Sequence, residues 1–104
     1  MFLARVEGAV VATKKDASMD GRKLLLLRPQ LVDDKNPGRL RPGANTIVAV
    51  DSVGAGEGEM VLFCQGSSAR LAPNMKDAPV DAVIIGIVDS VDVLGKQIFN
   101  SRTG

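Results

Sequence analysis

Short apolar runs rich in Val and Ile, interrupted by Gly and Pro, most limit what this 104-residue chain can fold into. Such runs are typical of β-strands, because β-branched side chains pack well on a pleated sheet while Gly and Pro end the runs. Several short strands with tight turns in a chain of this length predict an all-β fold, either a small closed barrel or a sandwich. The expected main strands are residues 2–14, 23–32, 45–53, 59–66 and 82–93.

The segments between these runs predict the connections. Gly8 is expected to bend or bulge the first strand, and Asp20-Gly21 is a hairpin-turn signal. Two Pro-Gly pairs predict a loop at 33–44. We also expect one helical turn at Ser67–Leu71, followed by a Pro-bounded loop, and a short edge strand within the tail 96–102.

Some of the expected strands are apolar on both faces. In a small barrel one face fills the interior and the other meets water, so apolar and polar residues should alternate. Residues 82–93 do not alternate, and 46–50 and 60–64 share this pattern. Leaving such a face exposed to water costs about 25 cal/mol of free energy per Å² of apolar area. We therefore expect a second copy of the chain to cover it, with ordinary scattered surface apolarity as the alternative.

The residue inventory argues against catalysis. The chain has no His, which removes the commonest general base and metal ligand near neutral pH. Its single Cys cannot form an intrachain disulfide or a Cys-rich zinc site, and Cys64 is best interpreted as a buried structural thiol. We expect no catalytic residue, no metal and no cofactor, and hence no enzyme.

Charge and hydropathy argue against two kinds of partner. A net charge of +1 offers no overall polycation for nucleic acid or a membrane surface. No apolar run approaches the roughly 20 residues of a membrane span, and no signal peptide is recognised. A single Cys with no disulfide partner fits the reducing cytoplasm. A barrel that binds single-stranded nucleic acid stays as the alternative, although three Phe and no Tyr or Trp offer few rings for base stacking.

The glycine-rich segment Gly54-Ala55-Gly56-Glu57-Gly58 has two interpretations. A phosphate-cradling loop would need a helix after it, whereas a strand is expected here and Glu57 would repel phosphate. A tight turn shaped by Gly54, Gly56 and Gly58 is therefore favoured.

Ser67 and Ser68 begin the expected helical turn, with Arg70 close by. A serine hydroxyl there would cap the turn by accepting a hydrogen bond from a backbone N–H group. An anion-binding or pore-lining role is the alternative.

Two further sets of charged residues are candidates for contacts. Asp51 and Asp89 are expected to be surface charges or to pair between subunits rather than to hold Mg²⁺. Arg39 and Arg41, in the 33–44 loop, are expected either to face solvent or to contact an acidic rim on a partner.

Taken together, the motifs resemble one family, the pentamer-forming vertex proteins of bacterial microcompartments, of the carboxysome and ethanolamine-utilisation type. The resemblance spans about residues 1–92, and several motifs occur in the family's order. These are GAVVATK (8–14), GRKLL (21–25), VAVDSVGAGEGEMVL (48–62), GSSAR (66–70), PVDA (79–82) and IVDSV (87–91).

The resemblance implies an all-β, five-stranded barrel of the oligonucleotide/oligosaccharide-binding (OB) type with one short helical turn, assembled as a cyclic pentamer. It implies one domain over 1–104, with 93–104 as a variable tail. The expected function is structural: the pentamer closes the vertices of a polyhedral shell in the cytoplasm. Its expected partners are its own copies and hexameric shell proteins, with trimeric ones as a further option.

The resemblance also suggests residue roles. Gly66, Ser67, Ser68 and Arg70 would lie at a subunit interface or at the axial opening. Asp51 and Asp89 would make polar contacts at an interface. Arg39 and Arg41 would contact hexamers.

Overall fold

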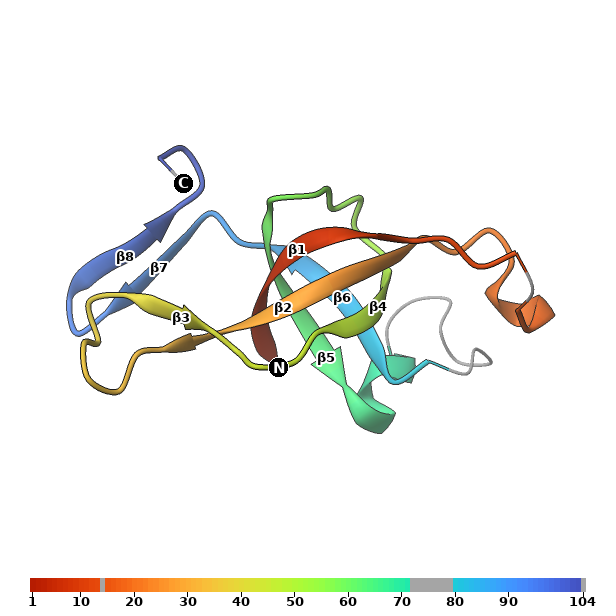
Figure 1. The fold of residues 1–104 in the computed structure, drawn as a ribbon, viewed down its shortest axis with the longest axis horizontal. Coiled ribbons are helices and arrows are strands. Elements are labelled where there is room, and N and C mark those ends of the chain that lie inside the picture. The colour runs from red at the N-terminus through yellow and green to blue at the C-terminus, as the bar shows by residue number, and fades with distance from the viewer. Residues whose placement is uncertain (14, 72–79, 104) are drawn as a thin grey trace.

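The computed structural model describes residues 1–13, 15–71 and 80–103 (Figure 1). Five strands form a sheet in the order β1-β5-β6-β4-β2, and a further pairing of β1 with β2 closes it into a barrel. These strands are β1 (Phe2–Val10), β2 (Leu24–Val32), β4 (Ile47–Asp51), β5 (Met60–Gln65) and β6 (Ala82–Ile87). The all-β fold predicted from the sequence is confirmed. None of the helices in the described part of the chain is long and apolar enough to span a membrane.

The barrel strands are antiparallel neighbours except β4 and β6, which run parallel. Two register shifts help the sheet to curve. One falls in β1 between Val6 and Gly8, where the sequence predicts a bulge, and the other lies between β5 and β6 at Leu62/Phe63. Because a bulge adds local twist and bend, it lets a short strand turn the corner of a small barrel.

The structure corrects three expectations about the elements. The predicted strand 82–93 is two strands, because the chain leaves the barrel after Ile87 and resumes as β7 (Ser90–Val93). The predicted loop 33–44 contains β3 (Leu40–Pro42), which pairs with the last residues of β2. The first strand ends at Val10 rather than at residue 14.

The Asp20-Gly21 pair turns the chain, but not as a two-residue hairpin. It follows the 3-10 turn η1 (Ala17–Met19), and the Arg22 N–H donates to the Met19 carbonyl oxygen at 3.1 Å. Asp20 has φ −61° and ψ 137°, and Gly21 has φ +76°, as in a type II turn. The loop is wider than predicted because η1 lies between β1 and this turn.

Two apolar clusters form the core. The first fills the barrel with small and medium side chains around Phe63, which is 1% exposed: Ala4, Val6, Leu25, Leu27, Ala49, Ala55, Val61, Ala82 and Ile84. The second lies on the other side of β4 and β6, where Val50 and Val83 pack with Ala69 and Val80.

The second cluster shows how the chain covers part of its own two-sided strands. Ala69 belongs to the 3-10 turn η2 (Gly66–Leu71), which matches the helical turn predicted at 67–71. Residues 72–79 of the expected loop lie outside the described residues. The cover is incomplete, because Val48 in β4 and Ile87 in β6 remain 46% and 40% exposed.

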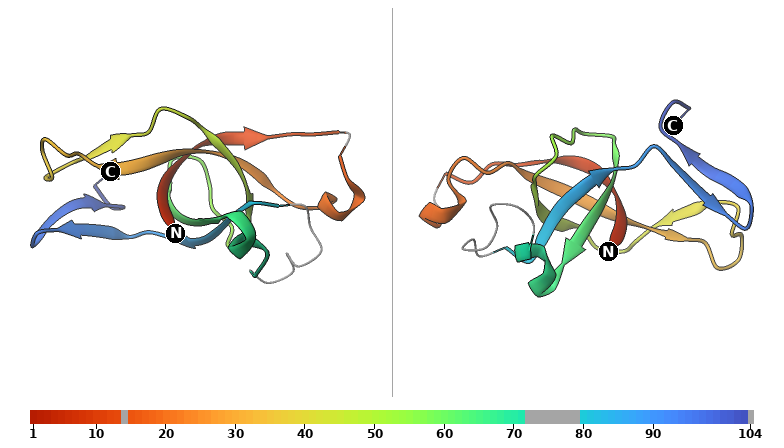
Figure 2. Two further views of the ribbon diagram at one scale, coloured as in Figure 1. Left: turned by 90° about the horizontal axis from the view of Figure 1, so that it is seen from below. Right: turned by 180° about the vertical axis from the view of Figure 1, so that it is seen from behind.

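Two ribbons extend from the same end of the barrel (Figures 1 and 2). One is the end of β2 with β3, and the other is β7 with β8 (Lys96–Asn100), which form a separate two-stranded sheet. Of these two, β8 is the short strand predicted within the tail 96–102. The molecule measures 45 × 24 × 23 Å with a radius of gyration of 14.4 Å. A compact chain of this length has a radius of gyration of about 13 Å, so the ribbons make this molecule elongated.

We predict that Phe63→Ala lowers the free energy of unfolding by about 3–5 kcal/mol, because it opens a cavity in a close-packed interior. Phe2 is the matched control, since its ring lies 5.4 Å from that of Phe63 but the residue is 48% exposed. Phe2→Ala should lower the free energy of unfolding by clearly less than Phe63→Ala does. Urea unfolding of both variants at one fixed protein concentration measures the difference. Equal losses would contradict a core centred on Phe63.

Candidate assembly surfaces

The glycine-rich loop between β4 and β5 is tied to the barrel by hydrogen bonds. The Gly58 N–H donates to the Val6 carbonyl oxygen at 2.8 Å, and the Arg5 guanidinium donates to the Gly58 carbonyl oxygen at 3.0 Å. Ala55 is fully buried, and Lys23 Nζ donates to its carbonyl oxygen at 3.0 Å. The loop is therefore a firm surface feature that connects two strands.

The three glycines of this loop differ in what they contribute. Gly54 and Gly58 have φ of +80° and +89°, a region that side chains with a Cβ atom rarely adopt. Gly56 has no positive φ, and its N–H donates to the Glu59 carboxylate at 2.6 Å. The turn geometry thus requires glycine at the first and third positions but not at the second.

The segment after β5 is where the sequence places a pore or interface candidate. Gly66 has φ +76°, and its N–H donates to the Asp81 carbonyl oxygen at 2.7 Å, which joins η2 to the start of β6. Ser67 is exposed on η2. Ser68 and Arg70 belong to η2 by their backbone, but their side chains lie outside what the structure describes.

The candidate carboxylates lie on separate elements. Asp51, at the end of β4, is half-buried and accepts a hydrogen bond from the Val53 N–H at 3.1 Å. Asp89 is exposed between β6 and β7, and its carbonyl oxygen accepts from the Ser101 N–H at 2.8 Å. Within the described ranges, no three Cys, Asp or Glu side chains gather where they could hold a metal ion.

The two candidate arginines of the β2–β3 ribbon are not equivalent. Arg39 Nε donates to Asp33 Oδ2 at 2.8 Å, and the Lys35 N–H donates to Asp33 Oδ1 at 3.0 Å. Both hydrogen bonds hold the pKa of the buried Asp33 carboxyl below its usual value, and the bond from the Lys35 N–H has the larger effect. Arg41 is exposed on β3 and makes no ion pair with any residue that the structure describes. Arg39 therefore braces the ribbon, whereas the charge of Arg41 is available to a partner.

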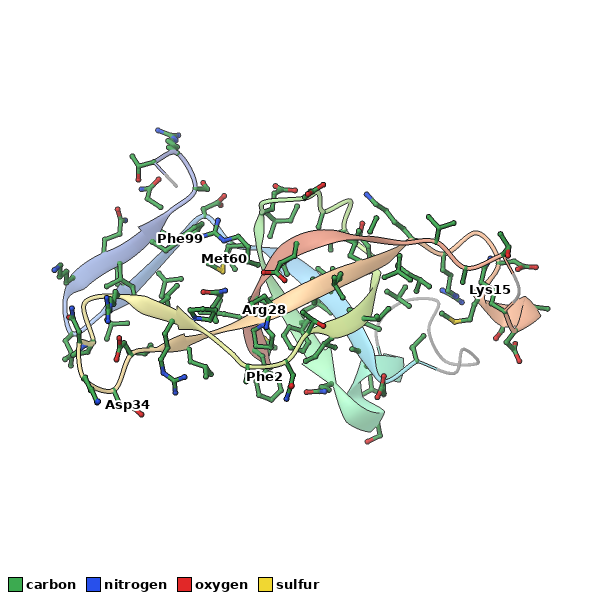
Figure 3. All side chains as sticks on the ribbon, in the orientation of Figure 1. Phe2, Lys15, Arg28, Asp34, Met60 and Phe99 are labelled. Carbon is green, nitrogen blue, oxygen red and sulfur yellow. The ribbon has the colours of Figure 1, made fainter. Side chains whose placement is uncertain are left out.

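Sequence reasoning missed how the β7–β8 ribbon is anchored. The Arg5 guanidinium lies over the Phe99 ring, 5.3 Å from its centroid, and Phe99 is buried although it lies in the tail. Phe99 and Met60 lie close together at the base of the ribbon (Figure 3). They line a cavity of about 220 Å³ with Arg5, Ile87 and Asp89. The sequence feature that could have indicated this anchor is the apolar Ile98-Phe99 pair within an otherwise polar tail.

Comparison with known proteins finds one family. The sequence model described as "Ethanolamine utilisation protein EutN/carboxysome" matches residues 1–89. The chain is 43% identical to the carboxysome shell vertex protein CcmL of Gloeobacter violaceus, covering 98% of this chain and 96% of that protein. The solved structure of that CcmL superposes with a TM-score of 0.84, covering 98% of this chain and 99% of the other.

Two further relatives extend the comparison beyond carboxysomes. The microcompartment shell vertex protein PduN of Salmonella typhimurium is 48% identical, covering 88% of this chain and 98% of PduN. The structure of GrpN from Rhodospirillum rubrum, described as a pentameric microcompartment shell protein, is 41% identical. It superposes with a TM-score of 0.73, covering 90% of this chain and 99% of GrpN.

We predict that Gly58→Ala destabilises the protein by about 1–2 kcal/mol, because a Cβ atom is disfavoured at positive φ. Gly56→Ala is the matched control. A Cβ atom at position 56 would lie 3.4 Å from Glu59 Oε1, which is an ordinary contact. Gly56→Ala should therefore change the free energy of unfolding by less than about 0.5 kcal/mol. Urea unfolding of both variants checks this prediction. A loss at Gly56 equal to that at Gly58 would refute it.

A pH dependence follows from Asp33. Its folded pKa lies below the unfolded value of about 3.9, so its carboxylate stabilises the fold above that pH. This stabilisation is lost as the pH falls through the folded pKa. Asp33→Asn should therefore weaken amide-exchange protection in the β2–β3 ribbon at pH 7, and the difference from the unmodified protein should shrink below about pH 4. Asp34→Asn, which alters an exposed neighbour, is the control. A difference that persists unchanged at pH 3 would contradict this assignment.

Proposed function

This chain belongs to the EutN/CcmL family, and from that premise we propose that it is a shell vertex protein of a bacterial microcompartment. The observation that carries the proposal is the agreement in sequence and fold along nearly the whole chain with relatives named as shell vertex proteins. Its setting is then the shell of a compartment in the bacterial cytoplasm, and its first partners are its own copies in a pentamer.

The mechanism is geometric. Hexagonal units tile a flat sheet, and a closed polyhedral shell needs five-fold units at its corners. In a ring each subunit presents two different surfaces, one to each neighbour. Because all subunits are identical, these two surfaces must be complementary to each other. The exposed apolar residues Val48 and Ile87 support such contacts, because a monomer would leave them in water.

We propose that the pentamer has no catalytic activity. The chain has no His, and the described residues bring together no candidate metal ligands. Its polar groups are used to hold loops, as Lys23 and Glu59 do at the glycine-rich loop. The role supported by these observations is to close and seal the shell.

The nucleic-acid-binding alternative finds no support. Base stacking needs exposed aromatic rings, but Phe63 and Phe99 are buried and only Phe2 is accessible. The relatives found are shell proteins.

The residue roles and domain limits stay proposals. We propose one structural domain over 1–104, with Gly66, Ser67, Ser68 and Arg70 at a subunit interface or the axial opening, and Asp51 and Asp89 in interface contacts. The exposure of Ser67 and Asp89 supports this placement. At the end with the two ribbons, Arg41 is the better candidate for a contact with hexamers, because Arg39 is already bonded to Asp33.

Native mass spectrometry and co-expression test the proposed function. The purified chain should have the mass of five copies. Co-expressed with the hexameric shell proteins of the same organism, it should yield closed particles, whereas the hexamers alone should form open sheets, tubes or leaky shells. A monomer at micromolar concentration, or equal closure with and without the chain, would overturn the proposal.

A further inference from the structure

The Asp20-Gly21 pair lies between η1 and β2, at the end of the molecule opposite the ribbons (Figure 1). Its sequence favours a spontaneous reaction of the backbone, in which a backbone nitrogen attacks the side-chain carboxyl carbon of the preceding aspartate and closes a five-membered succinimide ring. Glycine after the aspartate favours this attack, because no Cβ atom obstructs the nitrogen. Asp20-Gly21 is the only Asp-Gly pair in the chain, and Asn-Gly does not occur.

The peptide between Asp20 and Gly21 is the central peptide of the type II turn. The two ends of the turn are held, since the Asp20 N–H donates to the Ala17 carbonyl oxygen and the Arg22 N–H to that of Met19, both at 3.1 Å. The Gly21 N–H donates to none of the residues that the structure describes. Ring closure requires this peptide to rotate about the Cα–C bond of Asp20. Such rotation costs no hydrogen bond of the turn, and glycine tolerates the backbone angles on both sides of it.

The Asp20 side chain has room to react. It is 72% exposed, and its one contact among the described residues is with Lys15, whose Nζ lies 3.9 Å from Asp20 Oδ1. A Cβ atom built on Gly21 would meet no atom within 4 Å, so the space around this peptide is open. The carboxyl group can therefore turn toward the Gly21 nitrogen without losing a hydrogen bond.

Three other pairs have the next most favourable sequence, because the residue that follows is a small serine: Asp51-Ser52, Asp89-Ser90 and Asn100-Ser101. The first is held at the end of β4. The Asp51 carboxylate accepts a hydrogen bond from the Val53 N–H at 3.1 Å, and the Ser52 hydroxyl donates to the Ile84 carbonyl oxygen at 2.6 Å. An attack on the Asp51 carboxyl group must first break the bond to Val53.

The other two pairs hold each other where β7 and β8 meet. The Ser101 N–H, which belongs to the peptide after Asn100, donates at 2.8 Å to the carbonyl oxygen of the peptide after Asp89. The Asn100 side chain also donates to Gln97 Oε1 at 3.0 Å. Both peptides that would have to rotate are thus joined by one hydrogen bond. Folding therefore restrains all three serine-containing pairs and leaves Asp20-Gly21 unrestrained.

We propose that Asp20 is a site of spontaneous isomerisation in the folded protein. The Gly21 nitrogen bonds to Asp20 Cγ, the carboxylic acid loses its hydroxyl group and the nitrogen its proton, and these leave together as one water. Water then opens the succinimide at either carbonyl carbon. Opening at Cγ restores aspartate, whereas opening at the backbone carbonyl carbon leaves isoaspartate, in which the main chain runs through Cβ and Cγ. One water is released and one is taken up, so the mass is unchanged and nothing is oxidised or reduced.

The modified turn should disturb the residues on both sides of it. Isoaspartate adds one methylene group to the main chain between Met19 and Leu24, and both of these side chains pack against the second apolar cluster. We expect η1 and the first residues of β2 to lose amide-exchange protection in the isomerised chain. This effect does not depend on the proposed shell function.

The test compares the folded protein, in the assembly it forms, with the same chain unfolded in guanidinium chloride, both aged near pH 6. Isoaspartate is measured at each site by peptide mapping with electron-transfer fragmentation and by methylation with an isoaspartyl methyltransferase. Where a bonded peptide must open locally before it reacts, folding should slow the reaction by about tenfold or more, as at Asp51, Asp89 and Asn100. At Asp20 folding should slow it by less than about threefold.

Two variants complete the test. Asp20→Glu keeps the charge but would require a six-membered ring, so isoaspartate at this turn should disappear while the other sites are unchanged. Asp20→Asn forms the same succinimide with ammonia as the leaving group, and it should deamidate in the folded protein. The inference is overturned if folding protects Asp20 as strongly as the three serine-containing pairs, or if Asp20→Asn stays intact in the folded protein. The native mass and shell closure of the unmodified chain test the proposed function separately.

Discussion

Closure of the five-stranded sheet through the pairing of β1 with β2 is the constraint on which the rest of the structure depends. β1 pairs with β2 on one side and β5 on the other, and this double pairing leaves no free edge in the barrel. A barrel of five strands has a narrow interior, which explains why Ala4, Ala49 and Ala82 lie among larger side chains there. The register shifts at Gly8 and Phe63 help these strands bend enough to close.

The ribbons are a consequence of that closure. The first part of β2 pairs with β4, and its last residues run beyond the barrel, where β3 pairs with them. On the other side, the chain leaves the barrel after β6 and pairs with itself as β7 and β8. A two-stranded ribbon is marginal by itself in water, so each is fastened by specific contacts: Asp33 with Arg39, and Phe99 with Arg5.

The same architecture accounts for the absence of an evident reactive centre among the described residues. The polar groups near the loops mostly satisfy backbone groups, as Asp51 does for Val53 and Lys23 does for Ala55. What remains for function is surface, in particular the partly exposed apolar residues on the barrel strands. Exposed apolar surface of this kind is typical of a protein that assembles with other subunits, which agrees with the family to which the chain belongs.

The sequence by itself determined the all-β fold, the barrel strands, the bulge at Gly8 and the family, because these follow from local patterns of apolar residues, glycines and motifs. Only the tertiary structure decided that the segment 82–93 divides into two strands and that β3 forms within the expected loop. It also decided which part of the outer faces of the strands η2 covers and which part stays exposed to solvent. These depend on pairings between residues far apart in the sequence, such as Val48 with Leu26 and Ile87 with Val61, which a one-dimensional pattern does not contain. The same holds for the sites. The sequence singled out Gly54, Gly56 and Gly58 together, and only the folded chain showed that Gly56 has no positive φ and that Arg39 is bonded to Asp33.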